Sequence, residues 1–381
     1  MLILIALMPW VVLVGLAGAS LVRRPRLRSY APAGAGPRVS VVVPARDEAG
    51  NIGVCLATLA HSQYANREII VVDDQSVDGT ADIVRALMER SQGDIRLVEG
   101  EPLPHGWLGK PWACWQGYRA ARGELLLFTD ADTRHEADLL GRAVAALETE
   151  RADLVTVVPE QELASFWERM IMPQILFMLG LRFRATRMNR TGNPRDVVAN
   201  GQFILIRRDT YEAIGGHEAI RGEVVEDLRL AQRTVEAGRR LFAAHAEEMM
   251  QTRMYRSLGG LVEGWSKNVA LGARQSVAPW LRPIVPWLLV AFLVCTWIAP
   301  PVLLIGAAVT GGASDVLLWS LSATILSLTF WLIMNVRLGV PSLYSLVFPI
   351  GALAAAAIVT RSALRGRRVA WRGREYVVEE S

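Results

Sequence analysis

Long stretches without a single charged residue lie toward both ends of this 381-residue chain, on either side of a charged middle. Residues 1–22 form the first stretch, and three more apolar runs follow at about 284–309, 316–336 and 343–360. Hydrophobic residues make up 52% of the chain and charged residues 20%, which is more apolar than a soluble protein usually is. The pattern excludes a disordered chain, a collagen and a fully soluble enzyme, and predicts a soluble domain tethered by membrane helices.

The first apolar run would span about 33 Å as a helix, which is enough to cross a bilayer. A cleaved signal peptide is the alternative, because Ala17-Gly18-Ala19 is a passable cleavage site. A signal peptide carries its basic residues before the apolar core, however, and here Arg23 and Arg24 follow it. We therefore expect an uncleaved anchor, with its C-terminal end and the middle domain in the cytoplasm.

Each C-terminal run is also long enough to span a membrane. Three crossings from a cytoplasmic domain would place the basic tail after Arg361 outside, against the preference of arginine for the cytoplasmic side. A break at Pro300-Pro301 into a short hairpin would restore an even number of crossings. The sequence predicts an integral protein of a bacterial inner membrane and leaves the number of crossings open.

The net charge of +4 does not indicate a nucleic-acid partner, because the arginines cluster beside the apolar runs, where they face lipid headgroups. Of the 41 basic residues only Lys110 and Lys267 are lysines. The cysteines Cys55, Cys114 and Cys295 lie far apart and show no metal-ligand spacing. A zinc site and a disulfide framework are therefore not expected.

Short β-branched runs alternate with helix-like stretches from Arg38 onward. Strands are expected at 39–43, 68–72, 95–98 and 125–128, with helices at about 49–59 and 78–88. This alternation predicts an α/β fold with a mostly parallel sheet flanked by helices, in which a ligand binds at the carboxyl ends of the strands. The polar residues that follow the strands are Arg46, Asp47, Glu48, Asp73, Asp74, Asp130 and Asp132.

The triplet Asp130-Ala131-Asp132 follows a run, Leu125 to Phe128, that is too apolar to be an exposed strand. Carboxylate oxygens suit Mg²⁺ or Mn²⁺, which keep some waters and bridge to a diphosphate. The alternative is an acidic turn in which Asp132 caps a helix running from Arg134. Together with the other acidic clusters at the same edge, the triplet predicts a divalent metal site at Asp130 and Asp132.

Several motifs, in this order, resemble those of the family 2 glycosyltransferases. They are Val39 to Glu48, Val72 to Thr80, Gly109-Lys110, Thr129 to Asp132 and Val225 to Leu230. The resemblance covers about residues 38–275 and is strongest to membrane-anchored enzymes that act on lipids, of the ceramide glucosyltransferase-like, hopanoid-associated and carotenoid types. It implies a nucleotide-sugar-binding fold of the GT-A type. It also implies inverting transfer of one sugar from a nucleotide sugar, expected to be a UDP-sugar, to a membrane lipid.

The resemblance also implies roles for residues in the nucleotide-sugar half of the domain. Asp74, with Asp73 beside it, would accept hydrogen bonds from the base or ribose. Lys110 would neutralise diphosphate charge, although a solvated surface lysine is the alternative, and Asp130 would contact the donor as well as the metal. The residues expected to line the same nucleotide pocket are Pro44, Ala45 and Glu48.

Asp227 is the expected general base. In an inverting transfer an acceptor hydroxyl attacks C1 while a carboxylate removes its proton and the nucleotide diphosphate leaves. The metal stabilises the leaving group, so no catalytic histidine is required. The alternative for Glu226-Asp227 is an acidic pair that stabilises the N-terminus of a helix. The order of the motifs along the chain favours the catalytic role.

The residues expected around the acceptor are Gly201, Gln202, His217, Glu226, Gln251, Tyr255 and Arg256. For His217 a structural role is the alternative, and the glycine motifs also form ordinary turns. Many relatives carry a Gln-x-x-Arg-Trp motif, whereas Met254 and Tyr255 stand at its last two positions here. This departure argues against processive polymerisation.

The predicted organisation is an anchor at 1–22, a basic linker at 23–37 and a catalytic domain at 38–250, divided after residue 150 into donor and acceptor halves. An interfacial amphipathic segment at 251–280, membrane helices at 281–360 and a basic tail at 361–381 follow. Residues 166–181 are interpreted either as a second interfacial segment or as core.

Three other functions compete with lipid glycosylation. A processive polysaccharide synthase needs more spanning helices and the intact arginine-tryptophan motif. A catalytically inactive scaffold would normally have lost the acidic clusters, which are complete here. A nucleotidyltransferase usually begins with a Gly-rich phosphate loop, which the stretch from Pro44 to Glu48 is not.

Overall fold

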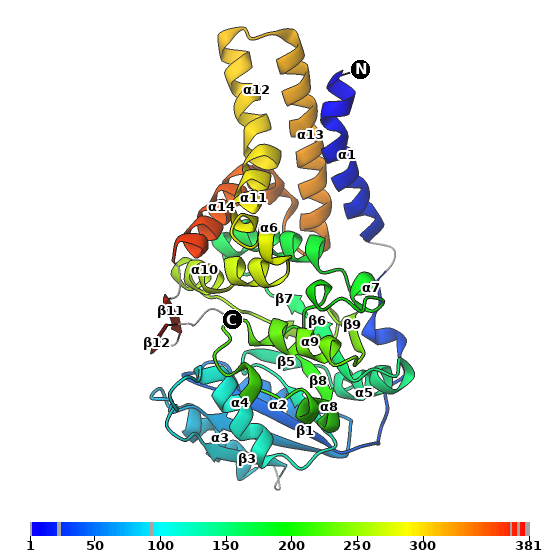
Figure 1. The fold of residues 1–381 in the computed structure, drawn as a ribbon, viewed down its shortest axis with the longest axis vertical. Helices are drawn as coiled ribbons and strands as arrows, with labels where there is room; N and C mark the ends of the chain where they lie inside the picture. The colour runs from blue at the N-terminus through cyan, green and yellow to red at the C-terminus, as the bar shows by residue number, and fades with distance from the viewer. Residues whose placement is uncertain (1, 21–23, 91–93, 366–367, 372–373, 378–381) are drawn as a thin grey trace. The chain divides into compact units, whose positions relative to one another are not determined.

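The computed structural model describes residues 2–20, 24–90, 94–365, 368–371 and 374–377, which form two compact units (Figure 1). The sheet unit comprises Pro25–Glu162, Phe183–Met254 and Arg367–Ser381, and the helical unit comprises Met1–Arg24, Leu163–Arg182 and Tyr255–Gly366. Leu163–Arg182 therefore belongs with the apolar helices, although it lies inside the range 38–250 that the sequence predicts for the catalytic domain.

A seven-stranded sheet in the order β3-β2-β1-β4-β8-β6-β9 is the centre of the sheet unit. Strands β3, β2, β1 and β4 are parallel, β8 is antiparallel to both β4 and β6, and β9 is parallel to β6. This arrangement confirms the predicted α/β fold with a mostly parallel sheet. The strands are β1 (Val39–Ala45), β2 (Arg67–Asp73), β3 (Ile95–Glu99), β4 (Leu125–Phe128), β6 (Leu154–Val158), β8 (Ile204–Arg207) and β9 (Leu241–His245).

Both faces of the sheet are buried, which explains why its strands are continuous apolar runs rather than alternating ones. In β1, Val41 and Val43 pack into one core and Val42 packs into the other. Helices α2 (Ile52–Ala60), α3 (Thr80–Met88) and α5 (Leu139–Thr149) contribute to the first core. Helices α4 (Gly109–Ala120), α8 (Arg208–Ala213), α9 (Glu226–Glu236) and the short α7 (Ala185–Met188) contribute to the second.

A small second sheet in the order β5-β10-β7 lies in the same unit. It consists of β5 (Thr133–His135), β7 (Glu160–Gln161) and β10 (Met250–Thr252). The alternative of a helix from Arg134 capped by Asp132 is wrong, because these residues pair antiparallel with β10 and the next helix begins at Leu139. The strands β11 (Arg368–Trp371) and β12 (Arg374–Val377) pair with each other as a hairpin.

In the helical unit three helices are long and apolar enough to cross a membrane, namely Val285–Thr310, Ser314–Arg337 and Ser342–Leu364. They match the three apolar runs of the sequence. The helices of this unit are α1 (Leu2–Ser20), α6 (Phe166–Arg182), α10 (Leu258–Gln275), α11 (Val285–Leu293), α12 (Ala299–Thr310), α13 (Ser314–Arg337) and α14 (Phe348–Leu364). Helices α1, α12 and α13 lie side by side (Figure 1), and the indole of Trp10 donates to Ser327 Oγ of α13 at 3.0 Å.

The chain does not turn back at Pro300-Pro301, so the alternative of a short hairpin there is wrong. Helices α11 and α12 form one continuous helix through a π-helical segment at Val294–Ile298. Proline lacks an N–H and its ring crowds the preceding turn. The wider i→i+5 turn directly before the prolines accommodates this crowding without ending the helix.

Candidate active site

The ends of β1 and β2 are joined at the edge where the sequence predicts a ligand site. The backbone N–H of Asp74 donates to the carbonyl of Ala45 at 2.8 Å, and Pro44 and Ala45 are the last residues of β1. The N–H of Gly100, after β3, donates to the carbonyl of Asp73 at 2.9 Å. A Cβ at Gly100 would lie 2.6 Å from that oxygen, so only glycine fits there.

Buried carboxylates occupy this edge. Arg46 Nη1 donates to the carbonyl oxygen of Asp74 at 2.5 Å and lies 3.8 Å from its carboxylate oxygen Oδ2. Glu48 Oε2 accepts a hydrogen bond from Asn51 at 2.7 Å. Asp73 is buried, and within the described part of the chain its Oδ1 has no hydrogen-bond partner. That oxygen can accept from a ligand, as the proposed nucleotide contact requires.

The loops after β1 and β2 hold each other in unusual backbone conformations. Asp47 and Gln75 both have positive φ angles, 53° and 58°, which are uncommon for residues other than glycine. The N–H of Asp47 donates to Ser76 Oγ at 3.0 Å, and Asp47 Oδ1 accepts from the N–H of Val77 at 2.9 Å. Such conformations persist where the surrounding structure fixes them, and they cluster at binding sites.

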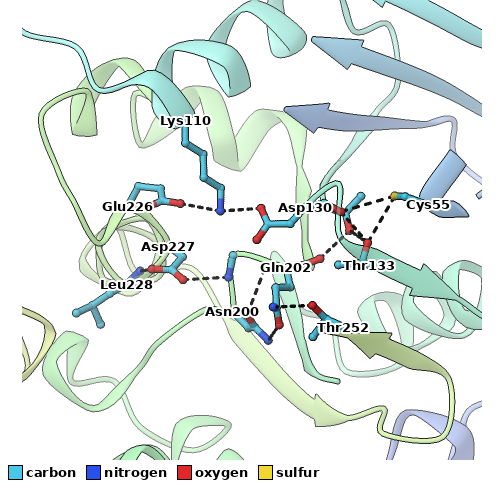
Figure 2. Close-up of polar contacts among 12 residues, drawn as sticks. Cys55, Lys110, Asp130, Thr133, Asn200, Gln202, Glu226, Asp227, Leu228 and Thr252 are labelled. Carbon is cyan, nitrogen blue, oxygen red and sulfur yellow. Dashed lines mark hydrogen bonds and ion pairs between the residues drawn. The ribbon is translucent and has the colours of Figure 1, made fainter. Parts of the chain in front are cut away.

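Lys110, in the first turn of α4, joins two acidic residues from distant parts of the chain (Figure 2). Its Nζ lies 2.8 Å from Asp130 Oδ1 and 2.9 Å from Glu226 Oε1. Burial disfavours the charged amine, but the carboxylates of Asp130 and Glu226 outweigh burial and raise the pKa of Lys110 well above its usual value. Lys110 is therefore a charged member of the cluster and not a solvated surface side chain.

Asp132 carries a carboxylate that is poorly compensated within the structure. Burial, the neighbouring Asp130 and Glu48 raise the pKa of Asp132 to about 7, because its negative charge lacks compensation. Its Oδ1 is buried and has no hydrogen-bond partner among the described residues. No three His, Cys, Asp or Glu side chains gather as a metal cage in the described ranges. Mg²⁺ and Mn²⁺ are suited to such a site, since one or two carboxylates hold them together with substrate phosphates.

A buried polar network supports the Asp130-Ala131-Asp132 turn from behind. Thr133 Oγ1 donates to the carbonyl of Asp130 at 2.7 Å, and Thr129 Oγ1 donates to the carbonyl of Gln202 at 2.7 Å. His135 Nε2 lies 2.8 Å from Thr133 Oγ1, and burial lowers the pKa of His135 to about 3, so the ring is neutral. Sequence reasoning missed these supporting residues, although the two threonines flank the acidic triplet.

The carboxylate of Asp227 lies in the first turn of α9 with both oxygens held (Figure 2). Oδ2 accepts from the backbone N–H of Gly201 at 3.0 Å, and Oδ1 accepts from the N–H of Leu228 at 2.7 Å. Burial and the adjacent Glu226 raise the pKa of Asp227 to about 6. A Cβ at Gly201 would lie 2.9 Å from Lys110 Nζ and 3.1 Å from Asp227 Oδ2, so glycine permits this close approach.

Gln202 and His217, which the sequence predicts near the acceptor, are both buried. Gln202 is buried and donates through Nε2 to Thr252 Oγ1 at 3.1 Å, next to the cluster in Figure 2. His217 is buried, its Nδ1 lies 2.8 Å from the hydroxyl of Tyr211, and burial lowers its pKa to about 3. His217 is therefore a packed, neutral side chain, which agrees with the structural role that the sequence offered as an alternative.

The stretch from Gln251 to Arg256 is divided between the two units. Gln251 donates to Glu160 Oε2 at 3.0 Å within the small sheet. Tyr255 belongs to the helical unit, where its ring centroid lies 6.2 Å from that of Trp265 in α10. Arg256 is exposed in the same unit. The acceptor roles of these residues stay predictions.

Comparisons with known proteins agree with this geometry. Residues 40–215 match the family model of glycosyl transferase family 2. The 4,4'-diaponeurosporenoate glycosyltransferase of Staphylococcus haemolyticus (strain JCSC1435) is 23% identical over 256 residues, which cover 66% of this chain and 66% of the relative. The enzyme of the same name from Staphylococcus aureus (strain MRSA252) is 26% identical over 257 residues, which cover 66% and 65%. The matches thus span just under two thirds of the relatives' length.

Among solved structures, the mannosyltransferase PcManGT from Pyrobaculum calidifontis, in complex with GDP-Man and Mn²⁺, has a similar fold. Its TM-score is 0.57 at 20% identity, with 95% of this chain and 97% of that chain covered. The family match and the shared fold confirm the resemblance seen in the sequence motifs. Residues 40–215 of this chain thus match glycosyl transferase family 2, and the chain has the GT-A fold.

Proposed function

We propose that this protein transfers a single sugar from a nucleotide sugar to a lipid in the membrane, with inversion at the anomeric carbon. The observation that carries the proposal is the cluster in which Lys110 joins Asp130 to Glu226, next to the held carboxylate of Asp227. The cluster combines a cation for diphosphate, carboxylates for a metal and a carboxylate for the acceptor proton.

The donor would bind at the edge formed by the loops after β1, β2 and β4. Asp73 and Asp74 would accept hydrogen bonds from the base or ribose, and a UDP-sugar suits them because uracil N3–H is a donor. Asp132 and Asp130 would hold Mg²⁺ or Mn²⁺, which, when bound, offsets charge on the leaving diphosphate. The complex of the archaeal mannosyltransferase with GDP-Man and Mn²⁺ supports this class of donor and metal.

Asp227 would act on the acceptor. Its pKa of about 6 leaves it ionised at neutral pH, yet more basic than an ordinary aspartate. The N–H groups of Gly201 and Leu228 fix its orientation. As the acceptor oxygen bonds to C1 and the bond from C1 to the diphosphate oxygen breaks, the hydroxyl proton passes to Asp227. Lys110 would stabilise the negative charge that accumulates on the donor side.

The lipid acceptor is supported by the apolar helices and by the name of the staphylococcal relatives, which act on a carotenoid. Expression in a host that lacks the gene should add a glycosylated lipid to the extractable lipids, as detected by mass spectrometry. The Asp227→Asn protein, produced at the same level, serves as the control. If the protein is produced and the set of extractable lipids stays unchanged, the proposal is contradicted.

We further propose that the catalytic domain faces the cytoplasm of a bacterial inner membrane and that the N-terminal helix is not removed. Protease added to intact cells should leave the domain uncut, whereas the same protease should digest it in inverted vesicles. The purified protein should retain Met1. Cleavage from outside intact cells, or an N-terminus near Ser20, would contradict this orientation.

A further inference from the structure

Helix α14 begins against α6. The side chain of Gln174 in α6 donates to the carbonyl of Phe348, the first residue of α14, at 3.2 Å in a buried contact. A Cβ at Gly351 would lie 2.4 Å from the carbonyl oxygen of Met170, so the two helix backbones approach closely. The N-terminal turn of α14 is thereby fixed to α6.

The other end of α14 is fixed to α10. Ser362 Oγ accepts a buried hydrogen bond from the N–H of Ala270 at 3.0 Å. Glu263 of α10 pairs with Arg361 at 3.1 Å and with Arg365 at 2.5 Å. Polar contacts thus hold the C-terminal turn of α14, as they hold its beginning.

Neither α6 nor α10 is among the candidate membrane spans of the described chain. The charged residues of these two helices are Glu168, Arg169, Arg182, Glu263, Lys267 and Arg274. Charged side chains are costly in the bilayer core, so such helices lie at the membrane surface. Because both ends of α14 are held by them, we infer that α14 also lies at the surface, although its length and composition would allow it to span.

A groove of about 790 Å³ lies between α14 and α11, the first part of a candidate membrane-spanning helix. Its walls are apolar, with Val290 on α11, Val294 at the start of the π-helical segment, and Leu353 and Ala357 on α14. Arg361, in the last turn of α14, and Arg365, directly after that helix, line it as well. This volume is in the range that holds a small-molecule ligand. An apolar groove with guanidinium groups on its wall suits an amphiphile with an anionic headgroup.

The groove presents two guanidinium groups, and both pair with the carboxylate of Glu263. The side chain of Arg361 is 58% exposed, so a ligand can reach it. Each guanidinium carries five N–H donors in a planar fork that fits phosphate oxygens.

We propose that the groove between α11 and α14 binds an anionic phospholipid, with an acyl chain along Val290, Val294, Leu353 and Ala357 and its phosphate at Arg361 and Arg365. Basic pockets next to membrane helices bind anionic headgroups in this way. The bilayer supplies such a lipid at the depth where α14 lies. The site is separate from the proposed sugar transfer, because none of its residues belongs to the sheet unit.

Native mass spectrometry of the full-length protein tests the proposal. The protein is reconstituted into nanodiscs of equal parts phosphatidylglycerol and phosphatidylcholine, released into detergent and measured with its retained lipids. The wild type should retain phosphatidylglycerol in preference. The double variant Arg361→Gln/Arg365→Gln should lose this preference about tenfold or more, since it removes the charge-assisted hydrogen bonds to phosphate. Arg282→Gln, which changes an exposed arginine outside the groove, is the control.

A second variant keeps the ion pairs with Glu263 and fills the groove instead. Ala357 is exposed, so Ala357→Trp should occupy the groove without disturbing the packing of α14 and should displace phosphatidylglycerol. Leu318→Trp, at an exposed position of α13, should leave retention unchanged. Equal retention of both lipids by the wild type, or equal phosphatidylglycerol retention by Ala357→Trp and the wild type, would overturn the proposal.

Discussion

Replacing Asp227 by asparagine is expected to lower the turnover rate by about 10²–10⁴-fold, the usual contribution of a positioned general base. Asparagine keeps the size of the side chain, and its oxygen can still accept from the N–H of Gly201. It cannot take up the proton of the acceptor hydroxyl. Donor affinity should stay nearly unchanged, because the lost interaction operates only in the transition state.

The pH dependence of turnover gives a second measurement of the same group. The pKa of Asp227 is raised to about 6, so the basic form is lost as the pH falls through that value. Turnover on a hydroxyl acceptor should therefore decline below about pH 6, with the slope of a single ionisation. At a saturating concentration of metal and donor, which keeps Asp132 ionised, the Asp227→Asn enzyme should lack this decline. Asp82→Asn, a change of an exposed aspartate on α3, should behave as the wild type.

The acceptor class changes the size of the effect. A lipid phosphate or carboxylate is already ionised near neutral pH, so it needs no base, and the Asp227→Asn loss should shrink. Wild-type turnover by Asp227→Asn on a hydroxyl acceptor would remove Asp227 from the catalytic residues. The same variant thus tests both the role of the residue and the chemistry of the acceptor.

Removal of the divalent metal is expected to abolish transfer, and added Mn²⁺ or Mg²⁺ should restore it. In the structure Asp132 has a raised pKa of about 7 and a buried oxygen without a partner among the described residues, so its ionised form lacks a counter-charge. A cation at this position would supply that charge. Asp132→Asn should therefore weaken metal-dependent nucleotide binding as well as turnover, which distinguishes it from Asp227→Asn.

Calorimetric titration of the nucleotide diphosphate, with and without Mn²⁺, measures this prediction directly. The wild type should bind more tightly with the metal, and Asp132→Asn should show little difference between the two conditions. Thermal unfolding checks that the variant is folded, and Asp82→Asn again serves as the surface control. Full activity in excess chelator would rule out a metal at Asp130 and Asp132.

The sequence predicts the parts of the fold that depend on local patterns. The run from Leu125 to Phe128 is a strand in the structure, with the same bounds, because an apolar run of this length between turns has few other conformations. The acidic residues after β1, β2 and β4 lie at strand ends, as their order along the chain predicts. Parallel strands bring their carboxyl ends to one edge of the sheet. The position of these residues can therefore be predicted without knowing any side-chain contact.

Features that depend on distant partners could not be predicted in this way. Thr133–His135 forms a strand because it pairs with Met250–Thr252, and no local pattern reveals that partner. Lys110 contacts Glu226 because the fold brings the first turns of α4 and α9 together. In the sequence each of these residues could equally be an ordinary surface side chain or part of an acidic helix start. The π-helical segment before Pro300 likewise depends on how the helix accommodates its prolines, which the sequence alone does not show.

The attachment of α14 to α6 and α10 has a consequence for how the chain enters the membrane. If α14 lies at the surface, as we infer, the helices Val285–Thr310 and Ser314–Arg337 would leave one side of the bilayer and return to it. Asp315 is the only charged residue between Arg282 and Arg337, so this excursion carries no basic residue across. Arg361 and Arg365 then stay on the side where α1 is followed by Arg24. In that topology the insertion machinery would retain every arginine flanking the apolar helices on one face, and no third C-terminal crossing would conflict with the basic tail.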